Sequence, residues 1–177
     1  MTPKFVIYTD GSCEPNPGPG GWAAILRYTN DSGRTFSRCF SGHTADTTNN
    51  RMEVMAVLSA LKRLKYASEV VVYSDSKYVV DAVGDWVNGQ PSAKRIGWMV
   101  KWRKNNWVRP TKNGPPNELK NADLWQEMYY LIVRHRSISM RWVRGHAGNK
   151  FNELCDVVAL EERIKATNGL LEARSQA

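Results

Sequence analysis

The chain has 177 residues and a mass of 20.1 kDa, the size of one domain. Hydrophobic residues make up 42% of it and charged residues 24%, and no apolar run approaches the roughly 18 residues of a membrane span, so a disordered chain and a spanning helix are excluded. The net charge of +8 is concentrated: residues 86–117 contain seven Lys or Arg and no acid, while the remainder contains 18 basic and 17 acidic residues. This concentration favours a polyanionic partner.

The amino terminus shows no export pattern. Residues 1–4 lead directly into an alternating apolar segment, without a signal or transit peptide. Cys13, Cys39 and Cys155 are widely spaced and form no CxxC pair, which argues against a disulfide framework and a structural zinc site. We therefore expect a cytoplasmic protein without membrane attachment.

The first 40 residues are predicted to be β-structure. Strands are expected at 5–9, 22–28 and 34–40, and residues 30–33 have the composition of a hairpin turn. Residues 15–21 are rich in proline and glycine, and we expect them to be irregular.

Helices and strands alternate in the rest of the chain. Apolar residues at every third position predict an amphipathic helix over 50–65, and the continuous apolar run before Asp75 is typical of a buried parallel strand at 70–74. The remaining expected elements are a helix at 76–87, a basic helix around Trp98–Trp102, a helix at 122–134, a strand at 138–143 and a helix at 152–165.

This order predicts an α/β fold with a mixed five-stranded sheet, in which three antiparallel strands are followed by two parallel strands and helices flank the sheet. We expect a single domain over residues 1–166 and a loose carboxyl-terminal tail at 167–177.

Four acids stand at positions where ligands gather in such sheets. Asp10 and Asp75 each follow a predicted strand, while Glu53 and Asp156 lie in the first turns of predicted helices. Two carboxylates 4 Å apart repel each other by about 4 kcal/mol at an effective dielectric of 20, and a divalent cation relieves that repulsion. Oxygen ligands without Cys or His partners favour Mg²⁺ or Mn²⁺ over zinc.

Each acid also has an ordinary structural interpretation. Asp10 precedes a glycine and fits a turn, and Asp75 precedes a predicted helix and fits an N-cap. Glu53 fits the capping pattern that begins at Asn50, and Asp156 complements a helix dipole. The hypothesis of a metal site therefore depends on the four acids together.

The chain resembles ribonuclease H of type 1 in four blocks that follow the family's order. The blocks are YTDGSC and NPGPGGW within 8–22, TTNNRME at 47–53, SDSKYV at 74–79, and WVRGHAG and NELCD within 142–156. The resemblance extends from the first predicted strand to the last predicted helix. It implies a ribonuclease H-like fold.

The resemblance also implies an activity. The family hydrolyses the RNA strand of RNA–DNA hybrids as a sequence-non-specific endonuclease, using two Mg²⁺ ions, for which Mn²⁺ can substitute, and leaving 5′-phosphate and 3′-hydroxyl ends. Asp10, Glu53, Asp75 and Asp156 match the family's metal-binding, catalytic carboxylates. His146 matches a mobile catalytic histidine that assists proton transfer or product departure. A monomer is the family expectation.

Further positions match contacts with the hybrid. The short polar residues and the thiol at these positions are Cys13, Asn16, Thr48, Asn49 and Asn50. Cys13 is interpreted as a packing or contact residue, not as a nucleophile. Lys77 departs from the glutamine usual in bacterial relatives, and a lysine cannot accept a hydrogen bond from a base edge.

The basic segment 86–117 matches the family's substrate-binding handle, with an apparent insertion at 89–100. Its expected contact residues are Trp86, Lys101, Trp102, Arg103 and Lys104. Packing between helices is the ordinary alternative for the tryptophans, and a solvated charged face is the alternative for the segment.

Two other functions compete with hybrid cleavage: another metal nuclease of the same superfamily, such as a junction resolvase, and a non-catalytic hybrid-binding protein. The presence of all four acids together with His146 disfavours the second, because unneeded negative charges weaken binding to a polyanion.

Overall fold

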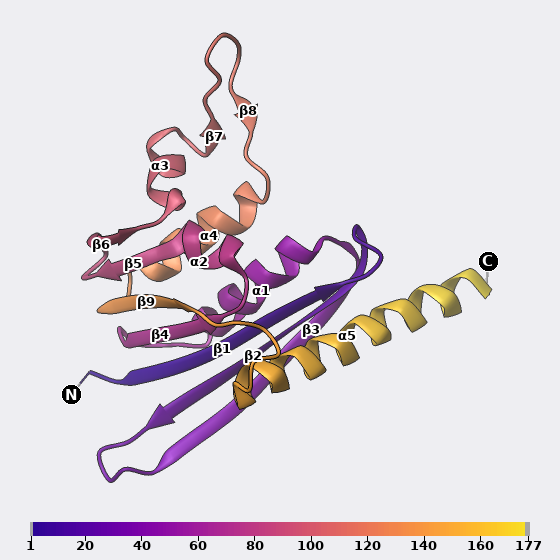
Figure 1. Ribbon diagram of the computed structural model, residues 1–177, viewed down its shortest axis with the longest axis horizontal. Coiled ribbons are helices and arrows are strands. Elements are labelled where there is room, and N and C mark those ends of the chain that lie inside the picture. The colour runs from indigo at the N-terminus through magenta and orange to yellow at the C-terminus, as the bar shows by residue number, and fades with distance from the viewer. Residues whose placement is uncertain (1, 176–177) are drawn as a thin grey trace.

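The computed structural model describes residues 2–175, which form a seven-stranded sheet, a separate two-stranded ribbon and five helices (Figure 1). The strands are β1 (Lys4–Cys13), β2 (Gly18–Thr29), β3 (Thr35–Thr47), β4 (Glu69–Ser74), β5 (Gly84–Val87), β6 (Gln90–Ile96), β7 (Val108–Arg109), β8 (Asn117–Glu118) and β9 (Ser137–Trp142). The helices are α1 (Asn49–Lys62), α2 (Lys77–Val83), α3 (Trp98–Lys104), α4 (Ala122–Ile132) and α5 (Lys150–Ser175).

The large sheet has the order β3-β2-β1-β4-β9-β5-β6. β1, β2 and β3 pair antiparallel, and β1–β4 and β4–β9 pair parallel. These are the five expected strands in the expected arrangement. β5 and β6 extend the sheet antiparallel beyond β9.

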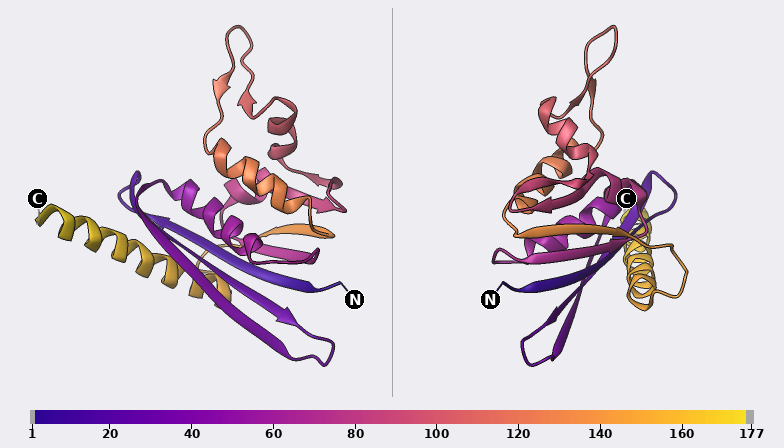
Figure 2. Two further views of the ribbon diagram at one scale, coloured as in Figure 1. Left: turned by 180° about the vertical axis from the view of Figure 1, so that it is seen from behind. Right: turned by 60° about the vertical axis from the view of Figure 1, so that its left-hand side comes forward.

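Helices cover both faces of the sheet (Figures 1 and 2). Ala24 and Leu26 of β2 belong to the large core that includes α1, α2 and α4, whereas Ala23 and Ile25 pack with α5 on the other face. This alternation follows from the two-residue period of a strand. None of the helices within residues 2–175 is long and apolar enough to cross a bilayer.

The helix expected at 76–87 is too long, because α2 ends at Val83. Gly84 has a φ of 67°, and a Cβ there would lie 2.4 Å from the backbone nitrogen of Gly97. The chain reverses at this glycine and pairs with β9, where Asp85 lies opposite Ser139. The segment 89–100, which looked inserted, thus forms β6 and the start of α3.

Part of the stretch expected to be irregular is a strand: β2 begins at Gly18 and includes Gly20 and Gly21. A Cβ on Gly21 would lie 2.4 Å from the carbonyl oxygen of Ala159 in α5. The glycine lets α5 lie against the backbone of β2.

The last helix is also longer than expected, since α5 runs from Lys150 to Ser175 rather than from 152 to 165. Residues 167–175 are therefore helical and not a loose tail, while 176–177 lie outside the described residues. The reason is composition: Ala, Leu, Glu and Arg are good helix formers, and a single Gly169 does not end the helix.

A buried carboxylate fastens α5 to β3. Glu162 accepts hydrogen bonds from Ser41 at 3.0 Å and from Lys165 at 2.8 Å, and it lies 2.6 Å from Nδ1 of His43. Burial alone would raise the pKa of Glu162, but these hydrogen bonds outweigh burial and lower the pKa to about 2.

We predict that Glu162→Gln lowers the free energy of unfolding at pH 7 by roughly 1–3 kcal/mol. The folded-state pKa of about 2 lies below the ordinary 4.5, so the carboxylate's contribution is complete above pH 4.5 and is lost as the pH falls towards 2. Denaturant titrations at several pH values measure this. A difference between the two proteins that is the same at pH 3 and pH 7 would contradict the prediction.

Candidate active site

Strand register places two of the predicted site residues side by side. The parallel pairing of β1 with β4 ends at Thr9 and Ser74, and Asp10 and Asp75 are the next residues of the two chains. The prediction that these two acids lie close together is correct, but only Asp75 follows the end of its strand, because Asp10 lies within β1. β1 itself continues past Asp10 to Cys13, because it still pairs with β2 there.

A close backbone approach brings in the third acid. A Cβ on Gly11 would lie 2.4 Å from the backbone nitrogen of Glu53 and 2.6 Å from the carbonyl carbon of Met52. α1 therefore crosses β1 in direct contact with Gly11, and the side chain of Glu53 is buried beside Asp10.

Asp10, Glu53 and Asp75 each place one carboxylate oxygen within 4.8 Å of the others. Asp10 is only 5% exposed and Glu53 6%. The Oε2 atom of Glu53 is buried and has no hydrogen-bond partner among the described residues. An unpartnered carboxylate oxygen in this position costs free energy unless a proton or a cation satisfies it.

The pKa values reflect this crowding. Burial, and next the charge of Asp75, raise the pKa of Asp10 to about 8. Burial, followed by the charges of Asp10 and Asp75, raises the pKa of Glu53 well above its usual range. Burial also raises the pKa of Asp75. At neutral pH the ion-free cluster therefore retains protons, which a divalent cation would displace.

The donor set fits a hard divalent cation. The three acids offer only oxygen atoms, and one of those oxygens has no hydrogen-bond partner within residues 2–175. Neither His nor Cys belongs to the group, which is the composition expected for Mg²⁺ or Mn²⁺ rather than for zinc.

Asp156 and His146 border this cluster. Asp156 adds to the repulsion that raises the pKa of Asp10, but its side chain is 42% exposed and it is not one of the three closest acids. His146 is 79% exposed, has a φ of 54°, and places Nδ1 3.8 Å from Oδ2 of Asp156. The histidine thus stands at the rim, in solvent.

The loop that carries His146 is held at both ends. A Cβ on Gly145 would lie 2.8 Å from Oδ2 of Asp75, so the loop begins in close contact with the cluster. At the other end, the amide of Gly148 donates a 2.9 Å hydrogen bond to Glu153 in the first turn of α5.

The polar residues expected to contact a substrate lie together. Oδ1 of Asn16 accepts a hydrogen bond from the amide of Asn49, and Thr48 caps α1 by accepting from the amide of Arg51. The capping role is therefore present. Asn16, Thr48 and Asn50 also line a hollow of about 830 Å³.

The basic arm, defined here as residues 97–120, forms the other wall of this hollow and projects from the body (Figure 1). Trp98, Arg109 and Lys120 line the hollow. A second hollow of about 480 Å³ adjoins it through Trp98 and Arg109, and it includes Lys101. The two hollows share Trp98, Trp102 and Arg109 in their linings, and the groove of the basic arm denotes the two together.

The predicted handle residues Trp86, Trp102, Arg103 and Lys104 lie in different environments: the tryptophans are buried, and the two cations line a separate hollow. Trp86 is buried and donates its indole N–H to the carbonyl of Val83, which agrees with the packing alternative. Trp102 is 8% exposed and packs against Trp125. Arg103 lies over the ring of Tyr129, and with Lys104 it lines a separate hollow away from the groove.

Cys13 is also buried. Its thiol donates to the carbonyl of Pro15 at 3.3 Å, and burial raises its pKa. This environment agrees with packing of the turn that carries Asn16.

Sequence reasoning did not single out Trp98, Arg109, Lys120 or Trp142. Trp98 and Arg109 lie in a uniformly basic, Trp-rich segment, in which spacing alone does not reveal orientation, and Lys120 lies just beyond that segment, in no pattern that marks it. Trp142 is the first residue of the WVRGHAG block, and its indole N–H donates to the carbonyl oxygen of Asp75 at 2.9 Å.

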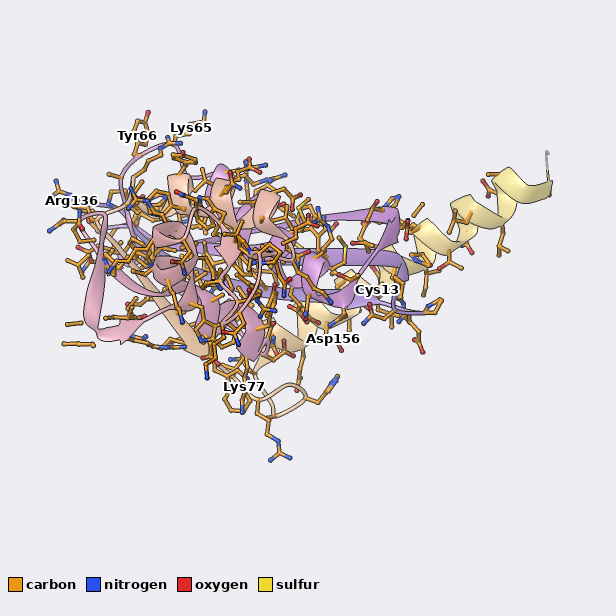
Figure 3. All side chains as sticks on the ribbon, turned by 90° about the horizontal axis from the view of Figure 1, so that it is seen from above. Cys13, Lys65, Tyr66, Lys77, Arg136 and Asp156 are labelled. Carbon is orange, nitrogen blue, oxygen red and sulfur yellow. The ribbon has the colours of Figure 1, made fainter. Side chains whose placement is uncertain are left out.

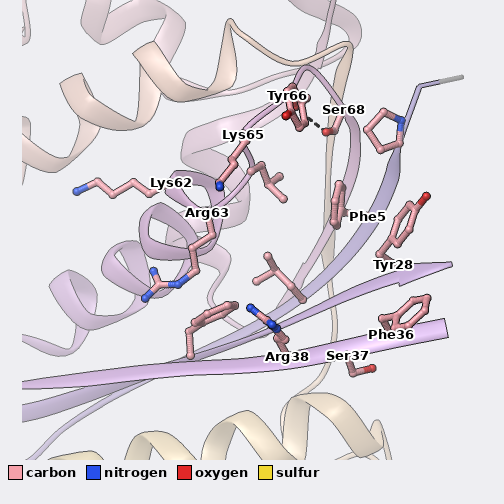
Figure 4. A pocket seen from close by; sticks show the side chains of 14 residues that line it. Phe5, Tyr28, Phe36, Ser37, Arg38, Lys62, Arg63, Lys65, Tyr66 and Ser68 are labelled. Carbon is pink, nitrogen blue, oxygen red and sulfur yellow. Dashed lines mark hydrogen bonds between the residues drawn. The ribbon is translucent and has the colours of Figure 1, made fainter. Parts of the chain in front are cut away.

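An apolar hollow of about 580 Å³ lies elsewhere, at the start of β1, where Phe5, Tyr28 and Phe36 line it together with Lys65 (Figure 4). No carboxylate lines it. Figure 3 shows Lys65 and Tyr66 at the upper edge of the molecule and Asp156 towards the lower edge. This hollow is not part of the candidate active site.

Comparisons with known proteins agree with the architecture. A model of the RNase H family matches residues 2–164. Ribonuclease H of Rickettsia massiliae is 42% identical over 166 residues, covering 94% of this chain and 95% of the relative. Ribonuclease H of Chromobacterium violaceum is 42% identical over 156 residues, covering 88% and 92%.

Two solved structures share the fold. LC9-RNase H1, described as a type 1 RNase H with the type 2 active-site motif, has a TM-score of 0.75 at 28% identity and covers 94% of this chain and 74% of its own. LC11-RNase H1 in complex with an RNA/DNA hybrid has a TM-score of 0.58 at 21% identity, covering 92% and 99%. The family match, the relatives and the fold agree, and the chain belongs to the RNase H family.

Proposed function

We propose that this protein is an endonuclease that hydrolyses the RNA strand of RNA–DNA hybrids without sequence specificity, leaving 5′-phosphate and 3′-hydroxyl ends. The observation that carries the proposal is the cluster of Asp10, Glu53 and Asp75 within 4.8 Å, in a chain 42% identical to bacterial ribonucleases H. A purely structural role does not account for buried acids crowded against their own repulsion.

Asp10, Glu53 and Asp75 would hold divalent cations, with Asp156 as a further ligand from the rim. Two Mg²⁺ ions, or Mn²⁺ in their place, would supply activation of a water molecule and neutralise the charge that develops on the phosphodiester. The protein contributes the anionic pocket, whose proton affinity makes cation binding stronger as the pH rises.

His146 would accept or donate a proton at the rim. Its exposure and its place in a glycine-bounded loop give it freedom to approach a bound substrate. An imidazole has one nitrogen that can accept a proton and one that can donate it, which suits proton transfer or product departure.

The groove along the basic arm would bind the hybrid. Polar side chains and backbone amides near Asn16 and Thr48 suit phosphate and 2′-hydroxyl groups, and Lys101, Arg109 and Lys120 suit phosphates. Recognition of backbone and groove shape implies little dependence on base sequence.

We predict that Asp10→Asn abolishes cleavage and leaves hybrid binding intact. Matched RNA–DNA hybrid, RNA duplex, DNA duplex and DNA four-way junction, each with Mg²⁺, Mn²⁺ or EDTA, form the assay. Cleavage of the junction alone would identify a resolvase, and a folded wild-type protein that binds hybrid but never cuts it would identify a binding protein.

The same variant has a second expected effect in the absence of divalent ions. The folded-state pKa of Asp10 is about 8 against an ordinary 3.8, so the charged form opposes folding, and stability of the ion-free wild type falls as the pH rises from about 4 to 8. Asp10→Asn removes this loss, so without divalent ions the variant should be more stable than the wild type at pH 8 and the two should converge towards pH 4. Thermal unfolding in EDTA tests the sign, and a less stable variant at pH 8 would contradict it.

We predict that His146→Ala lowers kcat roughly a hundredfold while the affinity for Mg²⁺ changes little. Calorimetric Mg²⁺ titration and single-turnover rates separate the two quantities. Equal losses in both would make His146 a metal ligand instead.

The arm offers a matched pair of variants. Replacing Lys101 and Arg109 by alanine removes two positive charges from the groove, and replacing Arg103 and Lys104 removes two from the other side. We expect the first pair to lower hybrid affinity about tenfold and to reduce the slope of log affinity against log salt by about 2, and the second pair to change both much less. Equal effects would show that the arm acts only through its net charge.

A further inference from the structure

An exposed tryptophan is fixed to the backbone of the candidate active site. Trp142 ends β9, opposite Ser74 of β4, so it stands at the same sheet edge as Asp75. Its indole N–H donates a 2.9 Å hydrogen bond to the carbonyl oxygen of Asp75. Nevertheless the side chain is 46% exposed, which is unusual for a large aromatic residue that has a fixed orientation.

Lys77 lies against this indole. It is the first residue of α2, two residues after Asp75, and its Nζ is 4.9 Å from the centre of the Trp142 ring. An ammonium over an indole face is attracted by the ring's quadrupole. Within residues 2–175, no carboxylate lies within ion-pairing distance of Lys77, so the ring is the partner that restrains its charge.

A chain of contacts links the Lys77 ammonium to the cluster of Asp10, Glu53 and Asp75. The strand end fixes Trp142, Trp142 is bonded to the main chain of Asp75, and Lys77 rests on the ring. An unpaired lysine beside crowded carboxylates would gain by pairing with one of them. Its position on the indole instead leaves the charge available at the edge where Asp156 also lies (Figure 3).

We propose that Lys77 binds a backbone phosphate of the hybrid near the point of cleavage and that Trp142 is a positioning residue that holds the Lys77 ammonium for this contact. The proposal rests on the proposed function, since it concerns the same substrate. A phosphate is the suitable group, because lysine acts as a compact point charge with three donors and no acceptor. This contact lies outside the groove of the basic arm, whose described lining does not include either residue.

Variants of Trp142 separate its two interactions. Trp142→Phe keeps an aromatic face for Lys77 and removes the N–H that Asp75 accepts, whereas Trp142→Leu removes both. Lys77→Ala removes the charge, and Lys77→Arg keeps it. Lys65→Ala is the matched control, because Lys65 is an exposed lysine at the opposite edge of the molecule from Lys77.

We expect Lys77→Ala to raise KM for the hybrid about threefold to tenfold, to leave kcat within about twofold, and to reduce the salt slope by about 1. Trp142→Leu should reproduce part of the KM increase, and the double variant should be no worse than Lys77→Ala, since Trp142 acts through Lys77. Trp142→Phe, Lys77→Arg and Lys65→Ala should stay within about twofold of the wild-type KM.

Hybrids that carry one neutral methylphosphonate linkage, scanned along each strand, locate the contact. One linkage near the cut should weaken binding to the wild type and to Lys65→Ala but not to Lys77→Ala. The absence of any such linkage would overturn the proposal, and so would a Trp142→Phe variant as impaired as Trp142→Leu, because the bond to Asp75 would then be what matters.

Failure of this inference is distinguishable from failure of the proposed function. If the wild-type protein cuts no hybrid, the proposed function is wrong. If the wild-type protein cuts hybrid and the Lys77 and Trp142 variants match it in KM and salt slope, the proposed function stands, and both the phosphate contact of Lys77 and the positioning role of Trp142 are wrong. Thermal unfolding of each variant identifies a loss that comes from misfolding.

Discussion

The constraint on which the candidate site depends is the forced proximity of carboxylates that repel one another. Asp10 and Asp75 are neighbours because β1 and β4 pair in parallel up to the preceding residues, and Glu53 joins them because α1 touches β1 at Gly11. These are main-chain contacts, and side chains cannot relax them without moving a strand or a helix. The fold therefore maintains a pocket that favours protons or cations.

Charge of the opposite sign surrounds this pocket at a distance. The groove along the basic arm carries Lys101, Arg109 and Lys120, and Lys77 rests on Trp142 at the carboxylate edge. Under the proposed function, the cations on the flanks would attract the polyanionic hybrid, and the carboxylates would accept its phosphates only together with divalent cations. The division explains how a chain of net charge +8 can keep an acidic active centre.

Much of this arrangement could be predicted from the sequence. Asp10 and Asp75 follow strand-like runs, so their meeting at one sheet edge was accessible to reasoning, and Glu53 fell in a clear helical period. The β5–β6 hairpin could not be predicted in this way. Gly84 interrupts an otherwise helical pattern, and β5 becomes favourable only because it pairs with the free edge of β9. Similarly, the orientation of each cation in the arm depends on tertiary packing: Arg103 lies on Tyr129, which is distant in sequence.

The β5–β6 hairpin also decides how the sheet ends. Without it, β9 would present unpaired amide and carbonyl groups beside the candidate active site, and another chain could pair with this edge. With it, the outer strand is β6, whose Pro91 has no N–H to donate and whose Lys94 is exposed. Both residues discourage edge-to-edge aggregation, so the hairpin protects the open margin of the sheet from self-association.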